Sequence, residues 1–379
     1  MHRPSDARPV LHVQQSGDDI DMRFGIVGTG LMAQEHIRTL ALVPGLQVAA
    51  LADPVPDSIA WARHTLGAGS EDVPAFDSVE AMLGAGGLDA VIVCSPNHTH
   101  HDVLDSLLAT DLHILCEKPL CTTVADARAV AERAEARARG VFWVAMEYRF
   151  MPPVRSFIDD LHDGRVGTLR RVALHEHRFP FLRKVGDWNR FNRNTGGTMV
   201  EKCCHFFDLM RHMVRAEPVR VFCSGAADVN HRDELYGGEV PDIIDNSYTI
   251  VEFDNGARAM LDLCMFADGA EEQERITAIG DAAMLEVGIP SGAKIFSPRV
   301  PLDAPKRIER EHVPVDARAL AAGNHHGASY GQLLAFLDAA NGRGPVQVTA
   351  RDGLSAVAIG VAAERSAAEH RAVAIEEVL

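Results

Sequence analysis

No apolar stretch of the sequence approaches the roughly 18 residues that a membrane-spanning helix needs. Residues 1–21 are polar and lack the apolar core of a secretory signal, and Met22 stands directly before the first predicted strand. We therefore expect 1–21 to be a disordered, dispensable extension. The seven cysteines are odd in number and show no paired, zinc-type spacing, which is typical of reduced thiols. These absences together predict a soluble, cytoplasmic protein.

Basic residues are outnumbered in this chain of 379 residues, with 37 Lys and Arg against 53 Asp and Glu and a formal net charge of −16. Such a chain repels nucleic-acid phosphates and anionic lipid, and its basic residues are scattered rather than clustered. We therefore expect no nucleic-acid partner and no membrane partner. With 47% hydrophobic residues, the chain can bury substantial cores and should form two domains.

Short apolar strands alternate with helical patterns through the first 145 residues. The strands are predicted at 23–27, 47–52, 90–94, 113–116 and 141–145, and the helices at 31–43, 55–66, 99–109 and 123–139. The apolar runs of the strands are unbroken, which is typical of a parallel sheet covered on both faces. The pattern predicts an α/β fold with a doubly wound, Rossmann-type sheet.

A glycine turn follows the first strand. Gly28 permits a tight turn, Gly30 lets backbone amides approach a pyrophosphate, and Ala33 keeps the following helix close to the strand. The N-terminus of that helix then faces the phosphates. Asp53 ends the second strand about 20 residues further on, where a carboxylate binds the adenosine ribose and repels a 2′-phosphate. An isolated turn of this kind is more often structural, but strand, helix and acid in register predict a dinucleotide site that prefers NAD to NADP.

Two further strand ends should lie at the same edge of the sheet, where open α/β sheets bind ligands. After the first of these strands comes 95–101, which contains three histidines. No acidic or cysteine ligand follows them at the spacing of a metal site, so we predict no metal here. We predict instead a helix cap, with Asn97 near the nicotinamide ribose. After the next comes Lys118, which Pro119 holds extended so that its amine points into the crevice. Elsewhere the pair Glu117-Lys118 would be a solvated ion pair, but this position favours acid or base chemistry beside a hydride acceptor.

Beyond about Tyr148 the rhythm changes to longer strands with alternating residues. They are predicted at 169–176, 219–224, 247–253 and 257–265, with the turn Asp254-Asn255-Gly256 between the last two. This pattern is typical of an antiparallel or mixed sheet with one covered face. No internal repeat or low-complexity linker separates the two halves, so we expect a packed junction near residue 146.

The segment 195–208 carries a second group of candidates. Glu201 and His205 are four residues apart, so on a helix they share one face. A carboxylate beside an imidazole can orient it and favour its protonated form, which suits a residue that takes a proton from a substrate hydroxyl. On an ordinary amphipathic helix the two would form a surface pair. The glycines before them and the apolar residues after them predict a buried helix whose start faces a ligand.

These residues resemble the glucose-fructose oxidoreductase and inositol dehydrogenase family (Gfo/Idh/MocA). The resemblance covers nearly the whole chain from Met22 and rests on Gly28-x-Gly30-x-x-Ala33, Pro96-Asn97-x-x-His100, Glu117-Lys118-Pro119, Tyr148-Arg149-Phe150, the Gly-Gly-x-x-x-acid-x-x-x-His segment ending at His205, and Asp352-Gly353-Leu354. It implies an NAD-binding Rossmann domain at 22–145. It also implies a substrate-binding α/β domain at 146–379, whose open, mostly antiparallel sheet is used for homodimer or homotetramer contacts.

The resemblance also assigns roles to particular residues. The family's catalytic lysine maps to Lys118 and its catalytic histidine to His205, whereas its usual aspartate is Glu201 here. The longer side chain leaves two roles open for Glu201, orienting His205 or binding a neighbouring hydroxyl. Cofactor-binding residues are expected at Gly28, Thr29, Gly30, Leu31, Met32, Asp53, Ser95, Pro96, Asn97, His100, Glu117 and Lys118. Substrate-binding residues are expected at Lys118, Arg149, Trp188, Asn189, Glu201 and His205.

The implied reaction is oxidation of a secondary alcohol, in which nicotinamide receives the hydride, His205 accepts the hydroxyl proton and Lys118 stabilises the developing alkoxide. Polar side chains at Lys184, Asp187 and Asn192 favour a sugar or cyclitol, and an inositol 2-dehydrogenase-like activity is the leading hypothesis. Trp188 could stack on a sugar ring or belong to the core, and His325-His326 could serve the site or face solvent. Two other classes stay open: non-redox cleavage of glycosidic bonds with tightly held NAD, and ligand sensing without turnover.

Overall fold

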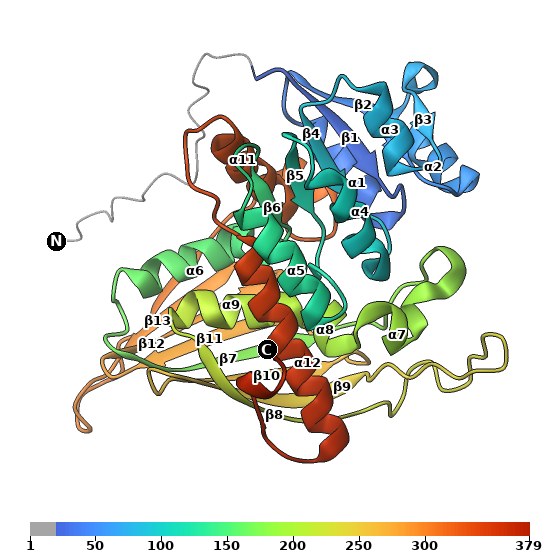
Figure 1. Cartoon of the computed structure of the whole chain (residues 1–379). Helices are drawn as coiled ribbons and strands as arrows, with labels where there is room; N and C mark the ends of the chain where they lie inside the picture. Colours follow the sequence, from blue (N-terminus) through green and yellow to red (C-terminus); the bar gives the residue numbers. More distant parts are fainter. Residues whose placement is uncertain (1–19) are drawn as a thin grey trace.

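The computed structural model of the chain describes residues 20–379, so all but the last two residues of the expected extension lie outside the described part. Two β-sheets organise the described residues, one with six strands and one with nine (Figure 1). Helix α12 (Ala350–Glu369) runs between them and contacts elements of both halves. None of the helices in residues 20–379 combines the length and the apolar character needed to cross a bilayer.

The six-stranded sheet is entirely parallel, as predicted. Its order is β3-β2-β1-β4-β5-β6. Its strands are β1 (Met22–Val27), β2 (Leu46–Ala52), β3 (Ala75–Phe76), β4 (Ala90–Val93), β5 (His113–Cys116) and β6 (Phe142–Val144). The strand order reverses between β1 and β4, and in such sheets the crevice at the carboxyl ends of these strands binds the ligand.

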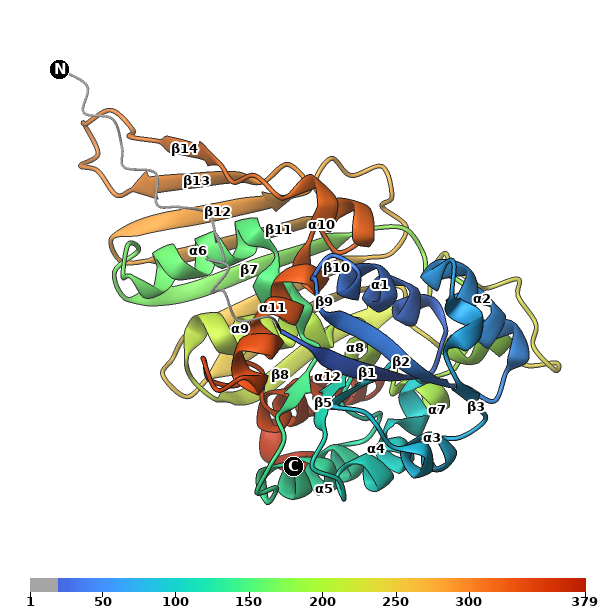
Figure 2. The same ribbon diagram turned by 90° about the horizontal axis from the view of Figure 1, so that it is seen from above.

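Helices cover both faces of this sheet (Figure 2). They are α1 (Leu31–Leu40), α2 (Pro56–Leu66), α3 (Val79–Ala85), α4 (His100–Leu107) and α5 (Val124–Glu135). α1 contacts α2, whereas α4 contacts α3 and α5. The sequence pattern did not predict β3 and α3, because a strand of two residues and a helix of seven give too little periodicity to detect.

The nine-stranded sheet has the order β14-β13-β12-β11-β7-β10-β9-β8-β15. Its strands are β7 (Leu169–His177), β8 (Pro218–Ala226), β9 (Asn246–Phe253), β10 (Arg258–Cys264), β11 (Glu274–Gly280), β12 (Ala283–Ile289), β13 (Ala293–Pro298), β14 (Glu309–His312) and β15 (Val373–Ala374). Neighbours are antiparallel except β7 and β10, which confirms the predicted mostly antiparallel sheet. β11–β14 were not predicted; β14 is made of charged and polar residues alone and carries no apolar alternation.

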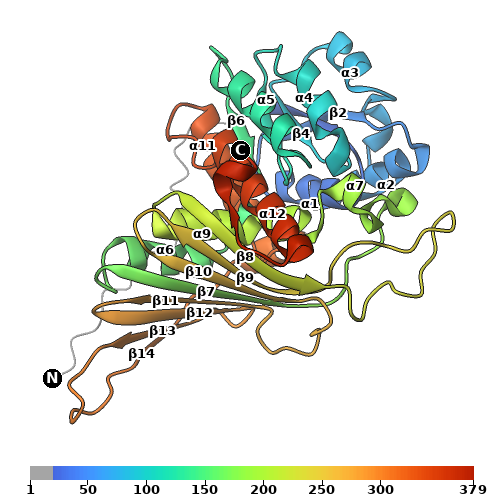
Figure 3. The same ribbon diagram turned by 60° about the horizontal axis from the view of Figure 1, so that its bottom comes forward.

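Helices cover one face of this second sheet, and within residues 20–379 no helix covers its other face, called the bare face below (Figure 3). The covering helices are α6 (Pro152–His162), α8 (Thr198–Glu201), α9 (Cys204–Val214) and α12. The remaining helices are α7 (Asn192–Thr195), α10 (Ala317–Ala322) and α11 (Ala328–Ala340). α11 packs against α1, so a segment from near the end of the chain lies against the first domain.

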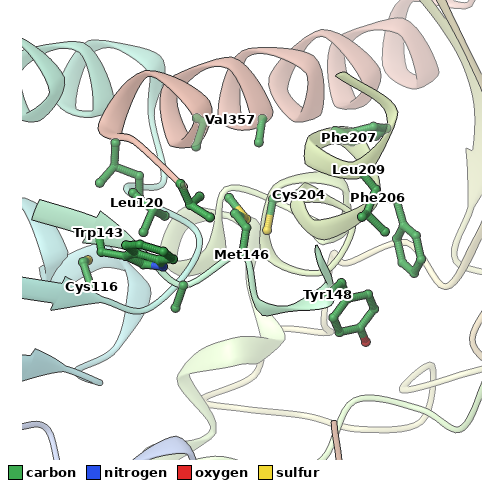
Figure 4. Packing of buried hydrophobic residues seen from close by; sticks show 14 of the residues in the cluster. Cys116, Leu120, Trp143, Met146, Tyr148, Cys204, Phe206, Phe207, Leu209 and Val357 are labelled. Carbon is green, nitrogen blue, oxygen red and sulfur yellow. The ribbon is translucent and has the colours of Figure 1, made fainter. Parts of the chain in front are cut away.

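A buried hydrophobic cluster continues from one half of the molecule into the other (Figure 4). Trp143 on β6 packs edge-on against Phe336 of α11, and Val357 of α12 lies over the same region. We propose that the domains divide between residues 145 and 146, because β6 ends at Val144 and every later strand belongs to the second sheet. All seven cysteines are free thiols.

Candidate active site

A cavity of about 620 Å³ opens where β1, β2, β4 and β5 end. Segment 183–188 of the second half closes one side, through Arg183, Lys184, Val185 and Trp188. Most of the predicted cofactor residues line the cavity, namely Gly28, Gly30, Leu31, Met32, Asp53, Ser95, Pro96, Asn97, Glu117 and Lys118. The cavity is therefore formed by residues from both halves of the chain.

The glycine turn has the geometry that a pyrophosphate needs. Gly28 has φ +80°, and a Cβ there would lie 2.4 Å from the backbone nitrogen of Ser95, so no larger residue fits. A Cβ at Gly30 would meet nothing within 4 Å, because this position borders the cavity. α1 begins after Gly30 without a side-chain cap, which leaves its first backbone N–H groups free for an anion. A dinucleotide cofactor fits these residues.

Asp53 both borders the cavity and holds the turn together. Its Oδ2 accepts hydrogen bonds from the backbone nitrogen of Thr29 at 2.7 Å and from the Thr29 hydroxyl at 3.0 Å. Its Oδ1 accepts from the backbone nitrogen of Val55 at 2.8 Å. Thr29 is fully buried and does not line the cavity, so its contribution is to fix the turn to the end of β2.

The loop after β4 carries one buried donor without a partner. Asn97 begins a short 3-10 helix (Asn97–Thr99) and is 5% exposed, and its Nδ2 has no hydrogen-bond partner. His100 lies behind this loop: its two ring nitrogens are 2.8 Å from the Pro119 carbonyl and 3.0 Å from the Ser95 carbonyl. Burial lowers the pKa of His100, against these two carbonyls. This corrects the prediction for His100, which connects two cofactor loops and does not line the cavity.

Glu117 and Lys118 follow β5 and both border the cavity. The Glu117 carboxylate is buried and lies 2.7 Å from Nε2 of His36 on α1. Lys118 Nζ donates a hydrogen bond to the backbone carbonyl of Glu201 at 3.2 Å, so the amine crosses from the first domain to the second. Burial alone would lower the pKa of Lys118, but Cys204 and the carboxylates of Glu147, Glu117 and Glu201 outweigh it and raise the pKa. Lys118 is therefore a cation at the domain junction.

His205 lies in the first turn of α9 and is 1% exposed. Its ring stacks on Tyr148 at 4.2 Å between centroids and 7° between planes, and its Nδ1 has no partner. Burial lowers the pKa of His205 well below its ordinary value, and the positive charges of Lys118 and Lys202 lower it further. The imidazole is therefore neutral and able to accept a proton.

Glu201 does not pair with His205, which corrects the predicted geometry. α8 ends at Glu201 and α9 starts at Cys204, so the two residues belong to separate helical segments joined by a turn at Lys202 and Cys203. Instead, Glu201 Oε1 is 3.0 Å from Nζ of Lys184, which lies over the ring of Trp188. The expectation that a carboxylate at Glu201 favours protonated His205 is therefore wrong.

The acid beside His205 is Glu147, in the 3-10 helix Glu147–Phe150. Glu147 Oε1 is 3.6 Å from His205 Nε2 and 3.9 Å from His325 Nε2. Burial, reinforced by Glu117 and opposed by His325 and Lys118, raises the pKa of Glu147 to about 7. On the far side, His325 Nδ1 is 2.9 and 3.0 Å from the two oxygens of Glu35 on α1. His325 is thus oriented by one carboxylate and turned towards another.

Several buried polar atoms at this junction have no hydrogen-bond partner. They are Nδ2 of Asn97, both carboxyl oxygens of Glu147, Oε2 of Glu201 and Nδ1 of His205. Buried polar groups are nearly always paired, so a group of unpaired ones indicates a place where a polar ligand completes the hydrogen bonding.

Among the predicted substrate residues, Lys118 and Trp188 line the cavity, whereas Arg149, Asn189, Glu201 and His205 do not. The Arg149 guanidinium binds both oxygens of Asp208 and also reaches Asp352. Asn189 is fully buried and donates from Nδ2 to the Leu182 carbonyl at 3.0 Å. The structure thus corrects the predictions for Arg149 and Asn189, which hold together the walls of the site and are not available to a substrate.

Sequence reasoning missed Glu147, His36 and Glu35. Glu147 directly precedes the Tyr148-Arg149-Phe150 motif, which was a usable signal. Glu35 and His36 gave no signal, since each faces a partner more than 80 positions away along the chain. His325 was noted, but nothing in the sequence chose between the site and solvent.

A dinucleotide-binding parallel sheet joined to a second, half-covered sheet defines a two-domain, nicotinamide-dependent oxidoreductase. The chain belongs to the Gfo/Idh/MocA oxidoreductase family: the profile for its NAD-binding Rossmann fold matches residues 22–145, and the profile for its C-terminal alpha/beta domain matches 158–375. The family resemblance predicted from the motifs is confirmed, as is an oxidoreductase with a nicotinamide cofactor.

Individual relatives cover nearly the same length. The chain is 27% identical to the rhizopine catabolism protein MocA of Rhizobium meliloti over 90% of this chain and 93% of that protein. It is 24% identical to myo-inositol 2-dehydrogenase of Thermotoga maritima over 94% of this chain and 100% of that protein. A levoglucosan dehydrogenase solved with NADH shares the fold with a TM-score of 0.81 at 19% identity, over 94% of this chain and 99% of that one.

Proposed function

We propose that the protein oxidises a secondary hydroxyl of a sugar or cyclitol with NAD, an activity of the inositol 2-dehydrogenase type. The observation that carries the proposal is the meeting of Lys118 with the segment that bears His205: the amine binds the Glu201 carbonyl across the domain junction, next to the unpaired atoms of Glu147 and His205. Relatives named as inositol 2-dehydrogenases support the substrate class.

Gly28, Gly30, Asp53 and Asn97 would hold the cofactor at the cavity wall. When bound, its nicotinamide supplies the acceptor for the substrate hydride. Asp53 at the end of β2 supports a preference for NAD, because a carboxylate repels the 2′-phosphate of NADP.

Lys118 and His205 divide the acid and base work. His205 is neutral because its pKa is lowered, and its Nδ1, which has no partner, would accept the hydroxyl proton. Cationic Lys118 donates a hydrogen bond to the same oxygen and stabilises the negative charge that develops there. Lys184 and Trp188 border the cavity on the substrate side and would contact a hydroxyl-rich ring.

Glu147 and His325 offer a route for the proton away from His205. His205 is buried, whereas His325 is 24% exposed and faces the same oxygen of Glu147. A carboxyl group whose pKa is about 7 can accept and release a proton near neutral pH. We infer that Glu147 passes the proton from His205 towards His325.

The open face of the second sheet supports a homo-oligomer, either a dimer or a tetramer. Phe222, Tyr248 and Ile250 on this face are 43%, 63% and 43% exposed, and apolar side chains gathered on one bare surface favour contact with a second copy. The free cysteines are consistent with a reducing, cytoplasmic location.

A polyol panel tests the proposed reaction. The purified protein is incubated with NAD and myo-inositol, scyllo-inositol, levoglucosan or related sugars while NADH absorbance is followed, and ketone reduction by NADH is measured in parallel. We expect NADH with at least one cyclitol or sugar, and a smaller rate with NADP. Hydrolysis of an aryl glycoside with no NADH from any polyol would instead assign the non-redox reaction, and tight sugar binding without turnover would assign a sensor.

A further inference from the structure

His175, His177 and Asp262 form a cluster outside the active site. His175 and His177 are two residues apart on β7, and Asp262 is opposite His175 on the neighbouring strand β10. Alternate residues of a strand share one face. All three side chains are half-buried, whereas their neighbours along each strand are buried, so the three lie on the bare face of the sheet, away from the covering helices. Two adjacent strands thus hold three side chains that commonly bind metals.

The distances between the ligand atoms fit a metal ion, and the shortest of them is also a hydrogen bond, between His175 Nδ1 and Asp262 Oδ2. One oxygen, Asp262 Oδ2, is 3.2 Å from His175 Nδ1 and 3.3 Å from His177 Nε2, and all three ligand atoms lie within 4.8 Å of one another. Charge-assisted hydrogen bonds are shorter, at about 2.7–2.9 Å. Ligands 2.0–2.1 Å from a tetrahedral zinc are separated by about 3.3 Å, which matches both measured edges.

The chemistry of the three groups selects the kind of cation. Two imidazoles and one carboxylate are ligands of Zn²⁺, Fe²⁺ and Co²⁺, whereas Mg²⁺ and Ca²⁺ prefer oxygen ligands alone. The strands fix the ligands, since all of β10 is paired with 171–177 of β7 in the middle of the sheet. The cationic neighbour facing the cluster is Arg275 of β11, opposite His175; it is exposed, so solvent screens its charge.

We propose that His175, His177 and Asp262 bind a divalent transition metal, zinc above all, with a fourth position left to water. The site lies on the opposite face of the sheet from Glu176 and Lys202, whose buried ion pair is near Tyr148. It is separate from the proposed dehydrogenase chemistry and does not depend on it. Because β7 leads directly to 178–190, a bound ion would stiffen the strand from which the wall of the cofactor cavity departs.

Cobalt and zinc titrations of the full-length protein test the site. After chelator treatment, Co²⁺ is added at neutral pH and its visible absorption is followed, and Zn²⁺ is then used to displace it. We expect one Co²⁺ per chain with the intense absorption of a four-coordinate ion. His177→Ala and Asp262→Asn should each weaken binding by about 100-fold or more, since they remove direct ligands. His312→Ala, which removes an exposed histidine of the same sheet on β14, should leave the affinity unchanged.

Thermal unfolding gives a second readout that is independent of colour. Zn²⁺ should raise the melting temperature of the wild type and of His312→Ala, because a ligand that binds the folded state stabilises it. It should not raise that of His177→Ala or Asp262→Asn, whose folding is checked by circular dichroism and by NADH binding. Equal Co²⁺ affinity in the wild type and in both cluster variants would overturn the proposal.

Discussion

The cofactor side and the proposed substrate side of the active site are built in different ways. On the cofactor side, each contributing group directly follows a strand of one parallel sheet, so short sequence motifs place it. The proposed substrate side consists of Glu147, His205 and His325, which are not part of the cavity lining, come from three separate segments and meet only through the packing of the domains. The difference teaches that short local motifs place the cofactor groups one by one, whereas the proton-handling groups depend on one another and on the packing of both domains.

Removing the amine of Lys118 should produce the largest effect, because this residue lies where the two sides meet. Lys118→Ala should lower kcat by roughly 10²–10⁴-fold, the range of a lost acid–base or oxyanion group, while NADH binding stays close to normal. Steady-state rates and NADH fluorescence titration measure the two quantities. Lys184→Ala is the matched control, since it removes a second cavity lysine that does not bind the Glu201 carbonyl. Full activity of Lys118→Ala would remove the residue from the mechanism.

Replacing Glu147 by glutamine tests the proton-handling groups on the substrate side. The pKa of Glu147 is raised from 4.5 to about 7, so the group is mainly protonated at pH 6 and ionised at pH 8. If the ionised form accepts the proton from His205, wild-type kcat should fall as the pH drops through 7. Glu147→Gln should lose about tenfold in kcat at high pH, less than the loss of a direct base, and its profile should lack that fall near pH 7.

The pH profile separates this role from a structural one. A merely structural glutamate would change the rate at every pH by the same factor. The profile of His325→Gln provides the comparison, because it removes the outer imidazole and leaves Glu147 in place. Parallel wild-type and Glu147→Gln profiles would contradict the proton route.

Replacing Asp53 tests the cofactor side of the active site. Asp53→Ala should raise the KM for NAD by about 10-fold or more, because a hydrogen bond to a charged group contributes about 1.5–3 kcal/mol, and it should narrow the gap between NAD and NADP. Thr29→Val is the control: it removes the hydroxyl that binds Asp53 and leaves the carboxylate in place. Initial rates with both cofactors decide the matter, and an unchanged preference would assign ribose recognition to another residue.

The sequence predicted the cofactor side of the active site well and the substrate side poorly. The turn at Gly28, the acid at Asp53 and the amine at Lys118 lie next to strands whose apolar runs are plain in the sequence, and the parallel sheet was predicted with them. The pairing of Glu201 with His205 was predicted from helical spacing and failed, because the Glu201 carboxylate binds Lys184, a partner that the spacing could not reveal. The metal cluster escaped notice because 87 positions separate His175 from Asp262, and only strand pairing brings them together.

Glu201 should give the smallest effect. Glu201→Asp withdraws the carboxylate from Lys184 by about one bond length but leaves the backbone carbonyl that binds Lys118. We therefore expect a few-fold rise in the KM for the polyol with little change in kcat, since a partly exposed ion pair contributes about 0.2–1 kcal/mol. Glu201→Gln keeps the length and removes the charge, so comparing the two separates position from charge. Loss of kcat in Glu201→Asp alone would mean that the carboxylate itself contacts the reacting hydroxyl. Glu201 would then belong with Glu147 and His205 to the groups that handle the proton.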